Sequence, residues 1–158
     1  DKEKIMKPQI STNTEQSRRL LSCGVDPKTA DMCIITYPNG YQQAYVGQVT
    51  IDADSIYTDG ELQAEYVILK GEPVWSLSRM LELIPSKIIA PHANTLCYFR
   101  LYHKPGKWMA MYHDGKNIRD AEDYYWQCMS QQEGEDPIEV CAMMIEWLTA
   151  NNYPLNKI

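Results

Sequence analysis

The chain of 158 residues contains no long hydrophobic run and no excess of basic charge. A membrane-spanning helix requires about 20 consecutive apolar residues, and no stretch approaches that length, so we expect no membrane partner. Lys and Arg number 15 against 21 Asp and Glu, which gives a formal net charge of −6. Nucleic-acid binding needs clustered basic residues to neutralise phosphates. The one adjacent basic pair is Arg18-Arg19, close to Glu15, and we therefore expect no nucleic-acid partner.

Phosphate-binding loops and patterned cysteines are also missing. The eight glycines are isolated from one another, and neither Gly-x-Gly-x-x-Gly nor Gly-Lys-Ser/Thr occurs, so the sequence predicts no cofactor. The five cysteines are odd in number and show no Cys-x-x-Cys spacing, which favours free thiols over a disulfide framework. No apolar block of the kind found in secretory signals follows the charged start, Asp1 to Lys4. We expect a cytoplasmic protein.

The spacing of acids and histidines does not predict a metal site. The acids between positions 52 and 61 have the residue types of a calcium loop, but Ile56 and Tyr57 stand where such a loop needs an oxygen ligand and a glycine. A turn is the better interpretation. His103 and His113 fall near opposite ends of a predicted β-ribbon, too far apart to share one ion at about 2 Å from each ring. We therefore expect no metal ligands.

Caps and apolar spacing predict three main helices. Thr12 and Thr14 are candidate N-caps of the first, and Thr12 has capping-box spacing to Glu15. Asp136 followed by proline is typical of the start of the last helix. On the middle helix the expected apolar face comprises Leu77, Met80, Leu81 and Ile84. The predicted helices span residues 12–23, 76–84 and 136–150.

The remaining segments predict antiparallel strands, because strands joined by short turns cannot be parallel. Turn signals at 38–40, 59–60 and 105–106 separate apolar, β-branched or aromatic runs. We predict an α+β fold: a two-layer sandwich in which an antiparallel sheet of β-hairpin plus meander is covered by about three helices. Residues 1–11 are expected to form a flexible N-terminal tail, and residues 12–158 a single domain. The expected strands cover 33–37, 41–46, 49–58, 62–69, 95–103, 107–113 and 117–119.

Three segments resemble a known group of proteins. They are residues 14–33, which include Cys23-Gly24-Val25-Asp26-Pro27, residues 73–85, which begin Pro73-Val74-Trp75-Ser76, and residues 137–153, with Glu146-Trp147-Leu148 near their end. In this order they are similar to short uncharacterised proteins of gut Bacteroidetes genomes and of their phages or mobile elements. The similarity covers roughly a third of the chain, mostly its helices, and residues 41–66 have no counterpart. The resemblance implies a setting and no catalytic residues.

Tyrosine and tryptophan dominate the aromatic residues, with eleven Tyr and four Trp against one Phe. Rings with a polar end are favoured at binding faces, because they combine a large buried area with a hydrogen bond. Alternation along the predicted meander separates a core set, including Cys97 and Phe99, from a Tyr/Trp set on the other face. The expected binding residues of this outward face are Tyr98, Tyr102, Trp108 and Tyr112.

An acidic segment follows the meander. Residues 120–139 carry seven acids and neither Lys nor Arg, so the other 138 residues sum to a net charge of +1. The segment contains Tyr124, Tyr125 and Trp126, which we add to the candidate binding residues. Two interpretations stay open for the acids: they attract a basic partner, or they are solvated surface. Two also stay open for the Tyr/Trp face, which is either an open binding surface or covered by residues 120–135.

The features above favour a non-enzymatic protein-interaction or accessory module with an unidentified protein partner. The alternative is an enzymatic or small-ligand-binding domain with a pocket around Cys97, His113 and Asp114, because these residue types suit an activated thiolate. That function requires His113 within hydrogen-bond reach of the thiol. The competing interpretation of Cys97 is a buried strand cysteine.

Overall fold

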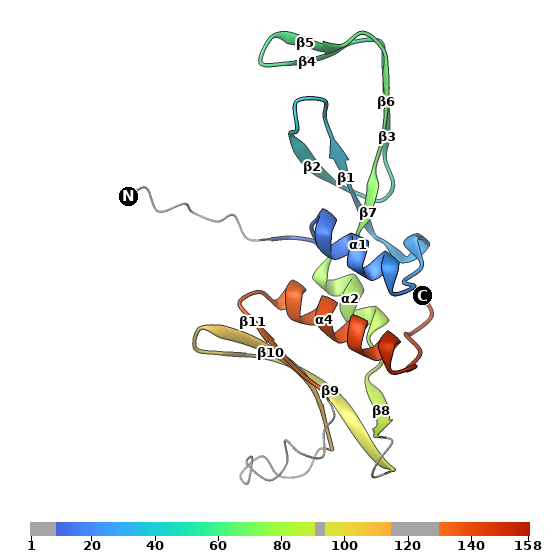
Figure 1. Cartoon of the computed structure of the whole chain (residues 1–158), viewed down its shortest axis with the longest axis vertical. Helices are drawn as coiled ribbons and strands as arrows, with labels where there is room; N and C mark the ends of the chain where they lie inside the picture. Colours follow the sequence, from blue (N-terminus) through green and yellow to red (C-terminus); the bar gives the residue numbers. More distant parts are fainter. Residues whose placement is uncertain (1–8, 91–93, 115–129) are drawn as a thin grey trace.

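A computed structural model describes residues 9–90, 94–114 and 130–158, and in these ranges the chain has the predicted α+β fold (Figure 1). The described helices are α1 (Thr14–Ser22), α2 (Leu77–Leu83) and α4 (Pro137–Ala150), with a 3-10 turn, η1 (Pro27–Thr29), after α1. No described helix is long and apolar enough to cross a membrane.

All described strand pairs are antiparallel, as predicted, but they form separate sheets. One sheet has the order β2-β1-β7 and another has the order β11-β10-β9-β8, and two-stranded ladders join β3 to β6 and β4 to β5. The strands are β1 (Met32–Thr36), β2 (Gln42–Val46), β3 (Thr50–Ala53), β4 (Ile56–Thr58), β5 (Glu61–Ala64), β6 (Val67–Lys70), β7 (Glu72–Val74), β8 (Lys87–Ala90), β9 (Thr95–Lys104), β10 (Lys107–His113) and β11 (Gln131–Gly134).

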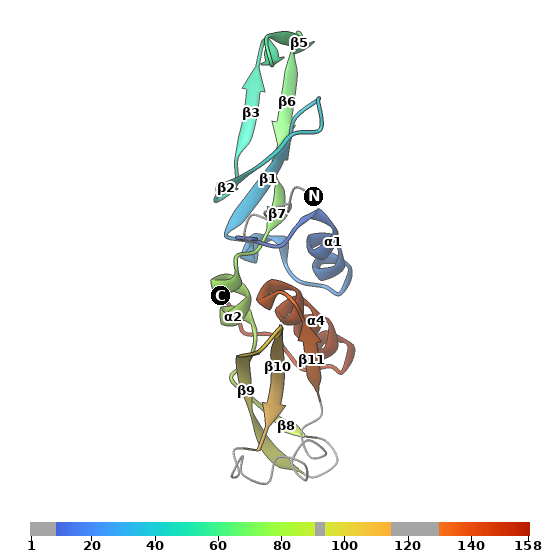
Figure 2. The same ribbon diagram turned by 90° about the vertical axis from the view of Figure 1, so that its left-hand side faces the viewer.

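The helices lie between the two larger sheets (Figures 1 and 2). Helix α4 packs on β10 and β11, and α1 and α2 pack on α4. The hairpin β1–β2 and the ribbon β9–β10, which we expected in one sheet, therefore belong to sheets on opposite sides of the helical layer. Helix α4 is covered by β10 and β11 on one side and by α1 and α2 on the other, and seven of its 14 residues are buried.

The core joins all three described helices to β8, β9 and β10. Its largest buried side chain is Trp75, which follows β7 and is fully buried. The indole Nε1 donates a hydrogen bond to Thr29 Oγ1 at 3.0 Å, so the polar atom of the ring is satisfied inside the core. This bond also fixes η1 against the chain segment that leads into α2.

The N-cap of α1 differs from the prediction. Asn13 is the cap, and its side chain accepts a hydrogen bond from the Gln16 amide while the Gln16 side chain accepts one from the Asn13 amide. Thr12 is fully buried instead, and its Oγ1 accepts a hydrogen bond from the Trp75 amide at 2.9 Å. Ser11, which we placed in the tail, forms an isolated β-bridge with Ser76. Ser11 and Thr12 are therefore fixed to the chain segment that directly follows β7.

The other helix predictions are confirmed with one correction. Asp136 caps α4, and its Oδ1 accepts from the Ile138 amide at 2.7 Å. Ser76 caps α2 as expected from the predicted start at residue 76. On α2, however, Leu81 is exposed and Leu83 is buried, because the helix packs between α4 and the loop that follows it rather than on one flat sheet.

The sheet β11-β10-β9-β8, which lies below the helices in Figure 1, is here called the lower sheet. Two of its strands are not predicted from the sequence. β8 and β11 flank the β9–β10 ribbon, and each has only four residues, two of them exposed in alternation. The third strand expected at 117–119 lies outside the described residues.

The predicted second hairpin, residues 50–70, is here called the arm. It contains the ladders β3–β6 and β4–β5, and its end bends over the β1–β2 hairpin (Figure 1). Asp59 and Gly60 both have positive φ, 54° and 78°, as the predicted tight turn requires. The arm rejoins the rest of the fold at Gly71, whose amide donates to the Val49 carbonyl at 2.9 Å.

Close packing at Gly71 gives a test of this junction. A Cβ at Gly71 would lie 2.5 Å from Cys33 Sγ and 2.7 Å from Cys33 Cβ, so Gly71→Ala overpacks a buried contact. We expect the free energy of unfolding to fall by about 1–3 kcal/mol in urea titration. The control is Gly134→Ala, where the nearest atom is a Val140 methyl at 3.1 Å, and the loss should be smaller. Equal losses would contradict the packing at Cys33.

Candidate functional site

The register of β9 with β10 divides the predicted Tyr/Trp face between two sides of the sheet. Residues that pair across antiparallel strands share a face, and here every pair joins an even-numbered residue to an odd-numbered one. Tyr98 and Tyr102 therefore lie on the face away from α4. Trp108 and Tyr112 lie on the face toward α4, so the prediction of one shared face is wrong. The pairs that establish this are Tyr98–His113, Phe99–Tyr112, Tyr102–Met109 and His103–Trp108.

Tyr112 belongs to the core and does not line a binding surface. Its side chain is fully buried, and its hydroxyl donates to the Pro85 carbonyl at 2.6 Å. The ring centroid lies 5.5 Å from that of Phe99 and 6.5 Å from that of Trp147 on α4. Burial raises the pKa of the Tyr112 phenol far above its ordinary value. Trp108 is half-buried against the same core.

The outer face of the lower sheet, the face away from α4, carries aromatic and basic side chains on β9 and buried methionines, Met109 and Met111, on β10. Tyr98 and Tyr102 are half-buried there, with the exposed Arg100 between them. Lys104 Nζ lies 5.7 Å from the centroid of the Tyr102 ring, within the range of a cation–π interaction. Sequence analysis missed this patch because its cations are spread over 21 positions and are assembled only by strand pairing. They are Lys87, Arg100, Lys104 and Lys107.

Three of the acids between 120 and 139 have internal roles. Glu133 Oε2 accepts from Lys107 Nζ at 2.8 Å, and Asp136 caps α4. Glu139 accepts from Arg19 Nη1 at 2.9 Å. The candidates Tyr124, Tyr125 and Trp126 lie outside the described residues.

Arg19 ties α1 to α4 through two carboxylates. It contacts Glu139 and also donates from Nε to Glu146 Oε1 at 3.0 Å. Gln16 Nε2 adds a bond of 2.5 Å to Glu139. These bonds to Glu146 and Glu139 raise the pKa of Arg19 above its ordinary value. All four polar groups have partners within the fold, so the cluster acts as a connection between helices rather than as a receptor for a ligand.

The structure does not bring the alternative catalytic residues together. Cys97 faces the core, is 1% exposed and pairs with Ile88, whereas His113 pairs with Tyr98 on the outer face. The sheet separates the thiol from the imidazole. The described cysteines are all free thiols, and Cys97 has the placement of a buried strand cysteine. Within the described ranges, no group of three or more His, Cys, Asp or Glu residues is arranged to hold a metal ion.

A cleft of about 640 Å³ lies where the C-terminal segment crosses the loop after α1. Asn156 holds that segment in place, donating from Nδ2 to the Glu82 and Ile84 carbonyls at 2.9 and 3.2 Å. The one acid in the lining, Asp26, caps η1 through the Lys28 amide at 2.9 Å. The lining offers no nucleophile with an adjacent base, so its geometry supports no reaction.

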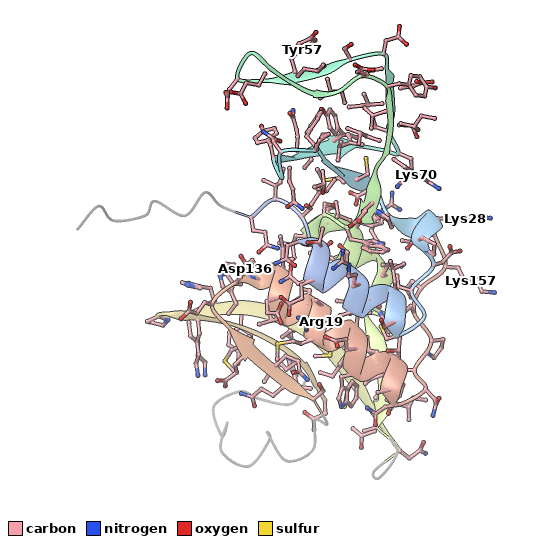
Figure 3. The ribbon with its side chains drawn as sticks, turned by 45° about the horizontal axis from the view of Figure 1, so that its top comes forward. Arg19, Lys28, Tyr57, Lys70, Asp136 and Lys157 are labelled. Atoms are coloured by element: carbon pink, nitrogen blue, oxygen red, sulfur yellow. The ribbon has the colours of Figure 1, made fainter. Side chains whose placement is uncertain are left out.

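Exposed apolar side chains concentrate on the arm and on the neighbouring hairpin. Tyr57 and Leu62 are cross-strand partners and are 63% and 48% exposed. Figure 3 shows Tyr57 at the end of the arm, far from Arg19 and the helical layer. Sequence analysis assigned no binding role to this region, although the apolar residues next to Asp59-Gly60 were a visible signal. The exposed large apolar residues here are Tyr41, Val46, Tyr57, Leu62, Tyr66 and Ile68.

His113 gives a test of the outer face. Partial burial and the positive charge of Arg100 lower the pKa of His113 below its ordinary 6.5, and Asp114 opposes this shift. The unfolded chain therefore binds the proton at higher pH than the folded one, and stability falls as the pH drops below 6.5. We expect His113→Gln to lose less unfolding free energy between pH 7.5 and pH 5.0 than the wild type. His103→Gln is the control, because His103 is exposed and lies on the opposite face. If His113→Gln lost as much unfolding free energy as the wild type over this pH range, the placement of His113 would be contradicted.

Comparison with known proteins adds no identity to this geometry. No family model, curated protein sequence or solved structure matches the chain. The resemblance to Bacteroidetes proteins stays a prediction, and function has to be argued from the surfaces described above.

Proposed function

We propose that the chain is a non-enzymatic protein-interaction module that docks a protein partner through the arm. The observation that carries this proposal is the exposed Tyr57–Leu62 pair at the far end of the arm. Cross-strand pairs with an aromatic residue stabilise a sheet through the contact between their side chains, but a large apolar pair left exposed to solvent is typical of an interaction site. Here both side chains of the pair are exposed, whereas Ile56, the preceding residue on β4, is 7% exposed.

The architecture of the arm supports a binding role over a purely structural one. A two-stranded hairpin is marginally stable in water on its own, so a chain that extends one from its core gains little stability from it. Clustered exposed apolar side chains mark interaction sites more often than scattered ones do. Tyr57 and Tyr66, 63% and 62% exposed, also have the amphipathic character that is enriched at interfaces.

The acidic character of the arm adds selectivity. Residues 50–70 contain five acids and one lysine, a net charge of −4. Charge around an apolar centre steers association and disfavours partners of like sign. A basic partner is one of the two interpretations left open for residues 120–139, and the proposal assigns such a partner to a different acidic segment.

The setting of the module is part of the same proposal. The resemblance of residues 14–33, 73–85 and 137–153 supports an accessory role in a phage or mobile element of Bacteroidetes, in the cytoplasm. No described group has the arrangement of a nucleophile and a base, and the sheet keeps Cys97 and His113 on separate faces. A protein-interaction module requires neither a nucleophile nor a general base.

The test is capture of the partner from an extract of the source cells with the immobilised full chain. We expect the double variant Tyr57→Ser/Leu62→Ser to lose the partner, since an interfacial hot spot contributes about 2 kcal/mol or more, roughly thirtyfold in affinity. Its melting temperature should stay close to wild type because both side chains are exposed.

A matched control removes exposed apolar side chains elsewhere. Leu81→Ser/Ile89→Ser changes residues that are 38% and 56% exposed and lie outside the arm, and it should capture the partner normally. Loss of capture by Tyr98→Ser/Tyr102→Ser alone, with the arm variant unaffected, would move the binding surface to the outer face of the lower sheet. Equal capture by all variants would refute docking through either surface.

A further inference from the structure

Strand β2, next to the arm, is an edge strand of the sheet β2-β1-β7. Four strands form the edges of the two larger sheets, and three of them carry the residues that normally prevent strand addition. β7 contains Glu72 and Pro73, β8 contains Lys87, and β11 contains Glu133. β2 contains no charge and no proline, and the whole segment from residue 32 to residue 51 is uncharged.

Within the part of the chain that the structure describes, the backbone hydrogen-bonding groups of every second residue of β2 point away from β1. Gly47 donates to the Asp31 carbonyl and Tyr37 donates to the Tyr41 carbonyl, both at 2.8 Å. In an antiparallel pair, hydrogen-bonded pairs alternate with pairs whose backbone groups point away. Among residues 9–90, 94–114 and 130–158, no strand and no other hydrogen-bonding group engages the outward backbone groups of β2. The residues that direct their N–H and C=O groups outward are Gln42, Ala44 and Val46.

A row of apolar side chains crosses the sheet and stops at this edge. Val74 on β7, Met32 on β1 and Val46 on β2 are aligned by the strand register. Val74 is fully buried and Val46 is 85% exposed, so the apolar row ends uncovered. One more strand beyond β2 would continue the row and cover Val46.

Charge indicates the chemistry of that strand. Residues 31–76 contain seven acids and one lysine, a net charge of −6, and Asp59 and Glu61 are exposed at the turn of the arm. That turn bends toward the side of the molecule on which β2 lies (Figures 1 and 2). A strand added to β2 has one face in line with Val46 and the other toward the acidic arm, because side chains alternate along it.

We propose that β2 captures an extended basic segment of a partner protein by strand addition, with apolar residues over Val46 and Lys or Arg facing the arm. This rests on the proposed function as a protein-interaction module and names the partner's chemistry. A second copy of the chain fits less well, since it would bring two acidic arms to one interface.

The experiment uses the full chain and an eight-residue peptide of alternating Val and Lys. We expect saturable binding that weakens with salt, and slower amide hydrogen exchange at Gln42, Ala44 and Val46. A peptide with Glu in place of Lys should bind at least about tenfold more weakly, because like charges then meet the arm. Equal binding of the two peptides would overturn the basic partner.

Backbone variants separate strand addition from simple charge attraction. Ala44→Pro removes an outward N–H that makes no bond to any residue the structure describes, and a proline is tolerated at that kind of position. It should abolish peptide binding, whereas Ala44→Ser should retain it. Val46→Pro with Val46→Thr as its control repeats the test at a side chain that is 85% exposed, in case Ala44→Pro does not fold.

The outcomes distinguish this inference from the proposed function. Full peptide binding by the folded proline variants would overturn strand addition at β2. A second outcome is that the proline variants still capture the cellular partner while Tyr57→Ser/Leu62→Ser does not. The arm would then remain the docking surface, and β2 would have no part in docking. Self-association of the wild type in sedimentation, lost in Ala44→Pro, would replace the basic segment by a second copy and overturn the proposal.

Discussion

The burial of α4 on two sides is the constraint on which the rest of the structure depends. Seven of its residues are buried, and they contact the lower sheet through β10 and β11 and the helical layer through α1 and α2. Arg19 adds a polar connection at the margin of this contact, where Glu139 and Glu146 accept its hydrogen bonds.

The helical layer lies between the two larger sheets (Figure 1), and the basic and acidic residues of the molecule are distributed unequally between its two sides. From the sequence alone, the net charge of −6 indicates a near-neutral chain with one acidic segment at residues 120–139. Strand pairing instead gathers four cations on the outer face of the lower sheet, while residues 31–76 carry a net −6. The acids at 133, 136 and 139 are largely used within the fold. A partner that approaches the arm therefore meets the electrostatic field of the acids in residues 31–76. The net charge of the whole chain does not reveal this local concentration.

Local signals were predictable from the sequence, and cross-strand geometry was not. Asp136-Pro137 and Asp59-Gly60 act through their own backbone, so the cap and the turn are confirmed. Paired residues of β9 and β10 share a face, and each pair joins an even-numbered residue to an odd-numbered one. The prediction of one Tyr/Trp face instead assumes that even-numbered residues of both strands share a face. That assumption predicts Tyr98 and Tyr112 on one face, whereas the observed register puts them on opposite faces. The cap at Asn13 was missed because Thr12 has a competing tertiary partner in Trp75.

The uncharged segment from residue 32 to residue 51 shows how packing and exposure compete in one hairpin. β1 lies in the middle of its sheet, where Cys33 and Ile35 are fully buried, and charge there would cost several kcal/mol to bury. The same argument does not apply to β2, which is an edge strand with three of its five residues exposed. Solvent exposure alone would favour a charge or a proline on β2, as on the other three edges. The proposed strand addition at β2 would account for the lack of both, because an added strand would cover this edge.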